Sequence, residues 1–357
     1  MIEGRLKDKF RKGLYAWHDD INRDMPWKET KDPYKIWISE IVLQQTRVEQ
    51  GKGYYERLVD RFPDVKSLAA ATVDEVLAMW KGLGYYTRAH NLHKAAKMIM
   101  GEHNGQFPST HEDILSLPGI GPYAAAAIAS FAYDLPYAVL DGNVYRVLSR
   151  YLDIDTPIDT TPGRKQFIAL SQMLLDENDP ARYNQAIMDF GALMCKPSVP
   201  LCMECPLIQS CQGYQNGVAD LLPVKSKKVK VKKRYFHYLS IISERGIILE
   251  KRGKNDIWNG LYELPMIEGP KRLSKKEVLQ EARQIYGAEI KIRMHHSATQ
   301  RLTHRLIHGD FYKVDGVSTI SQYKWVRKED IYNLGLPKII DDYLNMYVVP
   351  DQNKTHR

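Results

Sequence analysis

The spacing of hydrophobic and polar residues changes character about two thirds of the way along the chain. Before that point apolar residues recur at helical spacing, which predicts helices over 74–80, 90–100 and 124–132. After it, short apolar runs predict strands that include 238–242 and 309–314. The chain is therefore expected to be multidomain, with an all-α part followed by an α+β part.

A basic run lies where the pattern changes. Seven of the ten residues 225–234 are Lys or Arg. This run is either a solvated linker or a linker that also follows a phosphate backbone, and both interpretations put a boundary here. We expect an N-terminal part over 1–216, a basic linker over 217–234, a second domain over 235–347 and a polar tail over 348–357.

Length and charge narrow the class of protein. The 357 residues suffice for two or three domains, and the net charge of +8 favours a polyanionic partner. No apolar run is long enough to span a membrane, and the N-terminus has no apolar stretch typical of a secretory signal. We therefore expect no membrane association and a location in the reducing cytoplasm.

Four cysteines fall close together and nowhere else: Cys195, Cys202, Cys205 and Cys211. The spacing C-x6-C-x2-C-x5-C differs from the two separated knuckles of a zinc ribbon and from the common ferredoxin spacings. A loop around one metal centre is favoured over a disulfide framework. Zinc, an iron–sulfur cluster and free structural thiols all remain open from the spacing alone.

The segment Leu117–Ser130 predicts a hairpin between two helices. Pro118 ends the first helix, Gly119 permits a left-handed turn, and Gly121 leaves the backbone open to a large anion. The helix that follows directs its unpaired N–H groups toward that anion. An ordinary αα-corner is the alternative to a phosphate-binding helix–hairpin–helix.

Two carboxylates stand in different sequence environments. Asp141 follows an apolar run at the start of a helix, where it is either a simple N-cap or a carboxylate kept ionised by the helix terminus. Glu40 lies within an apolar stretch, where burial raises a carboxyl pKa and makes it a general acid, or else it belongs to a polar stripe. One protonated and one ionised carboxyl is the usual pair for cleaving a glycosidic bond.

Taken together, these motifs resemble the endonuclease III superfamily and, more closely, the MutY-type adenine DNA glycosylases. The likeness spans essentially the whole chain. It rests on MPW at 25–27, PYKIWISEIVLQQT at 33–46, GLGYY at 82–86, LPGIGPY at 117–123, VLDGNV at 139–144, NQAIMDFGALMC at 184–195 and the cysteine spacing. The resemblance implies an all-α helix–hairpin–helix glycosylase region whose four cysteines, over 195–211, hold a [4Fe–4S] cluster.

The resemblance also implies the roles of the catalytic residues. Glu40 matches the acid that protonates adenine N7, and Asp141 matches the carboxylate that stabilises the deoxyribosyl cation, either electrostatically or through a transient covalent bond. Tyr123 stands where bifunctional relatives have a lysine, and a phenol cannot form a Schiff base, so a monofunctional glycosylase is expected. Asn143 is expected to orient the catalytic groups.

Further positions are matched to the handling of DNA and of the flipped base. Trp27 could instead be core packing. The implied residues are Gln45 and Tyr85 as wedges in the duplex, Arg23, Trp27 and Gln185 around adenine, and Pro118, Gly119, Gly121 and Lys196 on the DNA backbone.

The C-terminal part resembles a Nudix-like α+β domain, most clearly at 259–265. Its helix near 277–287 lacks the Glu-rich cluster of a Nudix hydrolase, so we expect a binding module that recognises 8-oxoguanine. Leu302, Thr303 and His304 correspond to the lesion-contacting loop, where the common pattern is Phe-Ser-His. Leu302 cannot stack as an aromatic side chain does, which predicts a modest loss of intercalative contact.

The expected partner is double-stranded DNA with 8-oxoguanine:adenine or guanine:adenine mispairs, bound by a monomer of bacterial, nucleoid-associated type. Two alternatives stand beside this interpretation, the first an enzyme of the same superfamily and the second a protein of a different class. One is a thymine- or pyrimidine-specific glycosylase, which Tyr123 and the Nudix-like part disfavour. The other is a DNA-binding module or redox sensor without chemistry, which the intact Glu40 and Asp141 disfavour.

Overall fold

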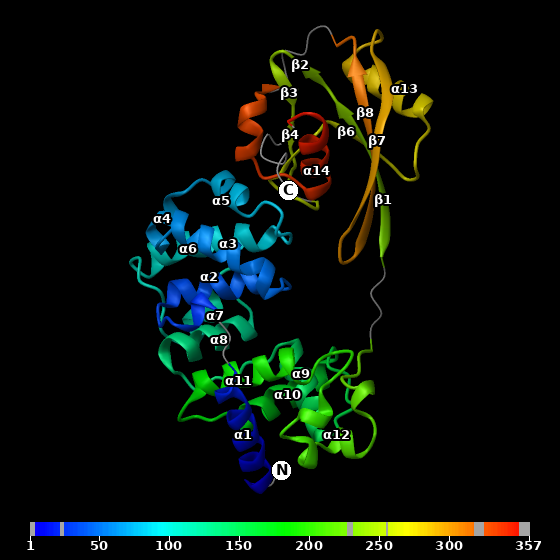
Figure 1. Cartoon of the computed structure of the whole chain (residues 1–357). Helices are drawn as coiled ribbons and strands as arrows, with labels where there is room; N and C mark the ends of the chain where they lie inside the picture. The colour runs from blue at the N-terminus through cyan, green and yellow to red at the C-terminus, as the bar shows by residue number, and fades with distance from the viewer. Residues whose placement is uncertain (1–3, 22–24, 227–230, 255, 318–324, 350–357) are drawn as a thin grey trace. The chain divides into compact units, whose positions relative to one another are not determined.

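A computed structural model describes residues 4–21, 25–226, 231–254, 256–317 and 325–349 of the chain (Figure 1). It divides into two compact units. The helical unit holds residues 4–69 and 94–226, and the sheet unit holds 70–93 together with the described residues from 231 onward. Residues 70–93 thus group with the C-terminal part. The domain boundaries expected at 216 and 235 stay predictions.

Helices make up the helical unit and flank the sheets of the other. The α-helices are α1 (Gly4–Asp19), α2 (Pro33–Leu43), α3 (Val48–Arg61), α4 (Val65–Ala70), α5 (Val73–Met79), α6 (Thr87–Glu102), α7 (His111–Ser116), α8 (Pro122–Tyr133), α9 (Gly142–Leu152), α10 (Thr161–Leu174), α11 (Pro180–Leu193), α12 (Gln212–Gln215), α13 (Lys275–Tyr286) and α14 (Lys338–Tyr347). The 3-10 helices are η1 (Pro26–Lys28), η2 (Cys202–Glu204), η3 (Ile208–Ser210), η4 (Ala219–Leu221) and η5 (Lys328–Asn333). The three helices predicted over 74–80, 90–100 and 124–132 are confirmed as α5, α6 and α8.

Local sequence explains where the helices around the site begin. Asp32 caps α2 by accepting from the Tyr34 N–H, and Pro33 occupies the first turn, where a missing N–H costs nothing. Pro122 begins α8 in the same way, after the N-cap Gly121. The alanines of α8 are buried, so this helix packs closely against α2, α7 and α11. That packing fixes the N-terminal ends of α8 and α9, which face the site.

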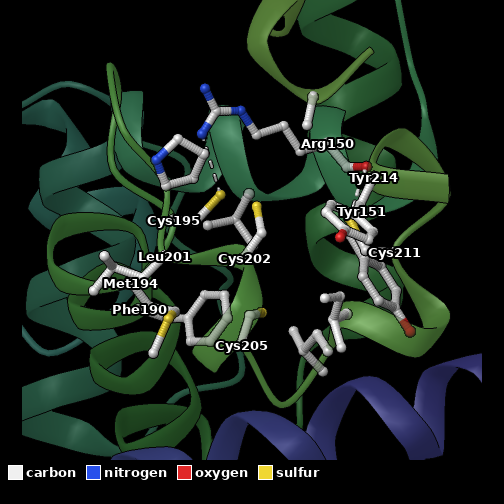
Figure 2. Close-up of a pocket in the computed structure, with 15 residues that line it drawn as sticks. Arg150, Tyr151, Phe190, Met194, Cys195, Leu201, Cys202, Cys205, Cys211 and Tyr214 are labelled. Carbon is white, nitrogen blue, oxygen red and sulfur yellow. Dashed lines mark hydrogen bonds between the residues drawn. The ribbon is translucent and has the colours of Figure 1, made fainter. Parts of the chain in front are cut away.

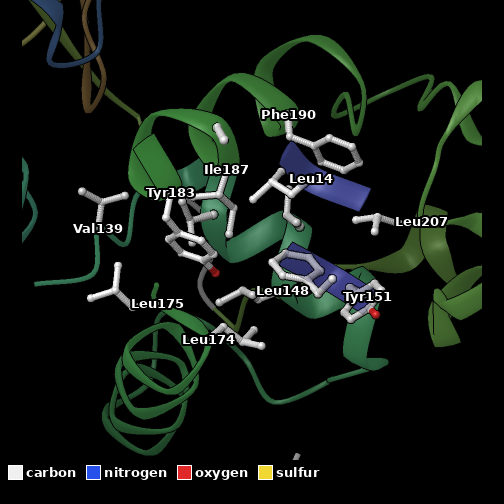
Figure 3. Close-up of a cluster of buried hydrophobic side chains, with 14 of the residues drawn as sticks. Leu14, Val139, Leu148, Tyr151, Leu174, Leu175, Tyr183, Ile187, Phe190 and Leu207 are labelled. Atoms are coloured by element: carbon white, nitrogen blue, oxygen red, sulfur yellow. The ribbon is translucent and has the colours of Figure 1, made fainter. Parts of the chain in front are cut away.

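The core of the helical unit gathers apolar side chains from α1, α9, α10 and α11 (Figure 3). Phe10 and Leu14 of α1 are fully buried there, and the Phe10 ring lies 4.7 Å from that of Tyr151. Leu207 of the cysteine loop belongs to the same core. The first helix and the cysteine loop therefore share apolar contacts with α9, which carries the catalytic candidates at its start.

The sheet unit is built on a four-stranded sheet of order β6-β1-β8-β7. Its strands are β1 (Lys232–Ser240), β6 (Met266–Gly269), β7 (Lys291–Arg301) and β8 (Arg305–Asp315). β1 pairs with β8 in parallel and with β6 antiparallel, while β7 and β8 form an antiparallel hairpin. Shorter sheets join β2 (Ile242–Ser243), β3 (Gly246–Ile248) and β9 (Trp325–Val326), and β4 (Glu250–Lys251) with β5 (Tyr262–Glu263).

These elements confirm the expected fold class, an all-α region followed by an α+β part. The predicted strand at 238–242 covers the end of β1 and the first residue of β2, and the one at 309–314 lies within β8. The basic run is not a linker over its whole length, because its last residues belong to β1, which begins at Lys232. Arg234 forms ion pairs with Asp256 and Glu268, so its charge is partnered within the unit. Lys227, Lys228 and Lys230 lie outside the described residues, as does the predicted tail from 350 onward.

Candidate active site

A cavity of about 530 Å³ in the helical unit gathers both predicted carboxylates. Its walls come from α2, the turn after α2, the first residues of α8 and α9, and α11. Glu40, Tyr123, Asp141, Asn143 and Gln185 all line it. Helices from distant parts of the chain thus bring four of the predicted catalytic residues and one pocket residue around one space.

Glu40 lies inside α2 with only 7% of its surface exposed. Burial raises the pKa of its carboxyl to about 7, because an anion loses hydration there. The nearby charge of Asp141 raises the pKa further, while a hydrogen bond from Tyr123 lowers it. The amphipathic alternative fails at this position, since Glu40 shares α2 with buried neighbours on every side. A carboxyl that titrates near neutrality suits proton donation.

Tyr123 occupies the first turn of α8, and its phenol reaches the same cavity. The hydroxyl lies 3.3 Å from the Met188 sulfur and also hydrogen-bonds Glu40. A carboxyl oxygen is a stronger acceptor than a thioether, so we assign the phenol proton to Glu40. Burial and the two neighbouring carboxylates hold the phenol pKa well above its ordinary value. Tyr123 is therefore a neutral donor at physiological pH.

Asp141 is the N-cap of α9. One of its oxygens, Oδ1, accepts from the N–H groups of Asn143 and Val144 at 2.9 and 2.8 Å, and Oδ2 accepts from the Asn143 side chain at 2.8 Å. Burial nevertheless outweighs these donors and raises the pKa of Asp141 above its ordinary value. The carboxylate is thus both an N-cap and a wall of the cavity, while the ionised state expected from the helix terminus stays a prediction.

A chain of hydrogen bonds holds Asn143 beside Asp141. The Arg146 guanidinium donates to the Asn143 side-chain oxygen at 2.9 Å, to the Gly191 carbonyl at 2.6 Å and to the Cys195 carbonyl at 2.7 Å. A Cβ at Gly191 would lie 2.6 Å from that of Asn143, so α11 and α9 touch at this point. Sequence reasoning missed Arg146. The sequence feature that could have indicated it is a cationic residue at a position of α9 that faces the apolar core.

The residues predicted around adenine are partly described. Trp27 and Gln185 line the cavity that holds the two carboxylates and also a second cavity, where Glu40 is again a wall residue. Trp27 is buried and packs edge-on against Tyr55 with ring centroids 5.2 Å apart. It is therefore a packed residue and a wall residue at once. Arg23 lies outside the described residues.

The predicted hairpin lies between α7 and α8. Pro118 follows the last residues of α7, and Gly119 has a φ of +80°, the left-handed turn expected of it. Gly121 is exposed at the N-cap of α8, and a Cβ there would meet nothing within 4 Å. The N-terminus of α8 is therefore open to solvent at Gly121, as a phosphate cradle requires.

Gln45 and Lys196 are two further candidates for DNA contact, and Gln45 lines the same cavity as Gly121 of that hairpin. Gln45 is exposed at the mouth of the main cavity with a left-handed φ of +56°. A residue other than glycine adopts this left-handed backbone conformation only at a cost in free energy, so the backbone at Gln45 is strained. Lys196 is half-buried, and its carbonyl accepts a hydrogen bond from Arg150.

All four cysteines line one cavity behind α9 and α11 (Figure 2). They are free thiols, and the rest of the wall is mostly apolar. Burial raises the pKa of Cys205 to about 12 and also raises those of Cys202 and Cys211, so a metal would be needed to hold these groups as thiolates. Within the described part of the chain, no three metal-binding side chains stand close enough together to ligate an ion as they are.

The chemistry of this donor set still fits a thiolate-bound metal centre. Arg150 lies 3.5 Å from the Cys195 sulfur and donates to the carbonyls of Lys196 and Pro197, so a cation accompanies the thiols. Four sulfur ligands in a mainly apolar wall are typical of iron–sulfur and structural zinc sites. The donors alone do not select between the two metals.

In the sheet unit a separate cavity of about 610 Å³ brings one predicted wedge and the predicted lesion-contacting loop together. Tyr85, Leu302, Thr303 and His304 all line it. The Tyr85 hydroxyl lies 2.8 Å from the Thr303 hydroxyl, and Tyr85 has a left-handed φ of +51°. Thr303 and His304 are exposed at the turn between β7 and β8. Sequence reasoning named both groups, but nothing in their spacing indicated that they touch.

Two known families match successive stretches of the chain, and the first stretch includes residues 70–93, which the structure groups with the sheet unit. Residues 38–169 match the HhH-GPD superfamily of base excision DNA repair proteins, and residues 237–346 match the NUDIX domain. None of the described helices is long and apolar enough to cross a membrane.

Individual relatives extend the likeness along the chain. The adenine DNA glycosylase of Buchnera aphidicola subsp. Schizaphis graminum is 31% identical over 94% of this chain and 97% of its own length. The mouse adenine DNA glycosylase is 40% identical over 60% of this chain and 44% of its own. A solved thermostable thymine-DNA glycosylase superposes with a TM-score of 0.57 at 27% identity, over 60% of this chain and all of its own. The adenine-specific relatives are thus more similar in sequence, and one of them spans both units.

Proposed function

The chain belongs to the adenine DNA glycosylase family of base excision repair enzymes, and we propose that its substrate is adenine mispaired with 8-oxoguanine or guanine in double-stranded DNA. The observation that carries the proposal is the pair formed by Glu40 and Asp141, which line one cavity in different surroundings. Such a pair divides acid and anion roles between two carboxyls.

In this mechanism the flipped base enters the cavity beside Glu40. The carboxyl of Glu40, with a pKa of about 7, gives its proton to adenine N7. The bond between C1′ and N9 then breaks, and its electron pair leaves with the protonated base. The cation that develops on the sugar is stabilised by the Asp141 carboxylate, which Asn143 orients through a 2.8 Å hydrogen bond. Water adds to C1′ and gives its proton to the Glu40 carboxylate, which leaves an abasic site and restores the acid.

Tyr123 determines that the reaction ends there. A lyase needs an amine that attacks C1′ and forms a Schiff base, and a neutral phenol cannot do so. The Tyr123 hydroxyl instead donates to Glu40 and restrains the rotation of its carboxyl. We therefore propose a monofunctional glycosylase whose product strand stays intact.

The four cysteines are proposed to hold a [4Fe–4S] cluster, in line with the resemblance of the whole chain. When bound, the cluster supplies four iron–thiolate bonds that close the loop from Cys195 to Cys211. Arg146 donates to the Cys195 carbonyl and to Asn143, so an ordered loop supports the residue that orients Asp141. Lys196 in this loop is proposed to contact the DNA backbone together with the N-terminus of α8.

The sheet unit is proposed to recognise 8-oxoguanine opposite the flipped adenine. Tyr85 is the proposed wedge, and its hydrogen bond with Thr303 links it to the loop that carries Leu302 and His304. Glu277 of α13 is used in a capping box with Ser274, which is a structural role rather than a magnesium ligand. The proposed location is the cytoplasm, with the protein acting as a monomer on the nucleoid.

A substrate panel tests this function. Single-turnover base release is measured on duplexes that carry adenine or thymine opposite 8-oxoguanine or guanine, with the released base identified by chromatography. We expect adenine release opposite 8-oxoguanine and guanine and none of thymine. Release of thymine from a guanine mispair at a comparable rate would support the pyrimidine alternative instead.

A further inference from the structure

Asp189 is a buried carboxylate that the mechanism above does not use. It lies on α11 one turn after Gln185, and its side chain is only 2% exposed. Among the described residues, three groups converge on one of its oxygens, Oδ2: the Lys28 ammonium at 2.7 Å, the Gln185 amide nitrogen at 3.0 Å and the His18 ring nitrogen at 3.4 Å. Asp189 itself lines the main cavity. A buried carboxylate in this position has a consequence for the amide beside it.

The two ends of a glutamine amide have almost the same shape but opposite hydrogen-bonding character. The NH₂ end donates and the oxygen end accepts, so the neighbours decide which end faces which group. An ionised carboxylate can only accept, and the Lys28 ammonium on the same oxygen favours the ionised form. Asp189 therefore takes the NH₂ end of Gln185 and leaves Oε1 as the end available to a base in the cavity.

This orientation has a defined chemical preference among purines. Adenine carries an amino group at C6, which donates to an acceptor such as Oε1. Hypoxanthine and guanine carry an oxygen at C6, which would face Oε1 as a second acceptor with no proton between them. A site that leaves a buried polar group unpaired rejects the wrong ligand strongly.

We propose that Asp189 is a positioning residue that fixes the Gln185 amide as an acceptor and thereby makes the pocket selective for 6-aminopurines over 6-oxopurines. This inference rests on the proposed function, in which Gln185 contacts the flipped base. Asp189 acts only through Gln185 and touches no reacting atom. The selectivity is set in the helical unit and is separate from the reading of the opposite base.

The test compares the single-turnover rates for adenine and hypoxanthine, each opposite 8-oxoguanine, in the full-length protein. Replacing the carboxylate by an amide, Asp189→Asn, permits the Gln185 amide to turn over. The ratio of the adenine rate to the hypoxanthine rate is expected to fall roughly 10-fold or more. A purely structural role for Asp189 lowers both rates together and leaves the ratio unchanged, which would overturn the proposal.

An exchange of the two groups provides the matched control. In the double variant Asp189→Asn with Gln185→Glu, the new carboxylate accepts from the Asn side chain and again offers only an acceptor to the base. We expect the ratio to return to within about threefold of the original value, and a ratio that stays low contradicts the inference. The double variant keeps one carboxylate in the pair. It therefore still tests the positioning role if the single variant Asp189→Asn does not fold.

The same experiment separates this inference from the proposed function. If the unaltered protein releases no adenine opposite 8-oxoguanine, the proposed function is wrong. If it releases adenine and the ratio does not respond to Asp189, only the positioning role is wrong.

Discussion

Tyr123 donates a hydrogen bond to Glu40, and so the residue that stands in the lyase position also holds the acid. The contact joins the first turn of α8 to the interior of α2 across the cavity. It lowers the Glu40 pKa, whereas burial and Asp141 raise it, and the balance lies at about 7. A change at Tyr123 therefore alters both the reaction outcome and the ionisation of the acid.

If Glu40 is the acid, the pH–rate profile should show a descending limb at high pH. Because proton donation needs the protonated carboxyl, the single-turnover rate should fall as pH rises through about 7. The Glu40→Gln variant should lose this limb and react about 10²- to 10⁴-fold more slowly at pH 6. Rates are measured by adenine release from an 8-oxoguanine:adenine duplex. A limb that persists in the variant would assign the titration to another group.

The same pKa makes an independent prediction for stability. A carboxyl whose folded pKa lies above its ordinary 4.5 stabilises the fold fully below pH 4.5 and loses that contribution as pH rises through about 7. The difference corresponds to about 3 kcal/mol. The free energy of unfolding of Glu40→Gln, relative to the original protein, should therefore rise by up to about that amount between pH 4.5 and pH 8 in urea titrations. A constant difference across this range contradicts burial of an ionisable Glu40.

Strand cleavage should depend on the side chain at position 123. In the Tyr123→Lys variant an amine stands in the cavity with Glu40 and Asp141, so we expect a covalent complex that borohydride traps and some nicked product. Tyr123→Phe, which removes only the hydroxyl, should show neither. Trapping of the unaltered protein at the level of the lysine variant would contradict the monofunctional assignment.

The cysteine loop should hold iron. Anaerobically purified protein is expected to contain about four iron atoms and four sulfides per chain by metal and sulfide analysis. Cys205→Ser, which alters one of the four thiols around the cavity, should lower the iron content and the melting temperature together. Zinc in place of iron at one atom per chain would show that the loop is a structural zinc site.

The loop at Leu302, Thr303 and His304 should carry the preference for 8-oxoguanine. The double variant Thr303→Ala with His304→Ala is expected to reduce the ratio of rates opposite 8-oxoguanine and guanine by about 10-fold. Thr303→Ser keeps the hydroxyl that meets Tyr85 and should retain the ratio. Full discrimination by the double variant would place lesion recognition elsewhere.

The parts of the fold that follow local rules were predictable from sequence. Pro33 and Pro122 mark helix starts, Gly119 marks a left-handed turn, and Asp141 marks an N-cap, because each acts through its own backbone. The apolar neighbours of Glu40 in the sequence also indicated that its side chain is buried.

Contacts between distant segments could not be read in the same way. The pairing of Tyr85 with Thr303, and the grouping of 70–93 with the sheet unit, depend on tertiary packing that no local pattern encodes. Arg146 and Asp189 lie at buried positions of α9 and α11, where a lone charge gives no indication of its partners. The cysteine spacing likewise indicated a common loop but not the metal.

The central claim is that Asp141 stabilises the cation formed when adenine leaves, and its direct test is a single-turnover measurement on an 8-oxoguanine:adenine duplex. Asp141→Asn keeps the N-cap hydrogen bonds to α9 but removes the charge. We predict that adenine release slows by about a thousandfold or more while DNA affinity changes by less than about threefold. Adenine release by this variant within tenfold of the original rate would contradict the account.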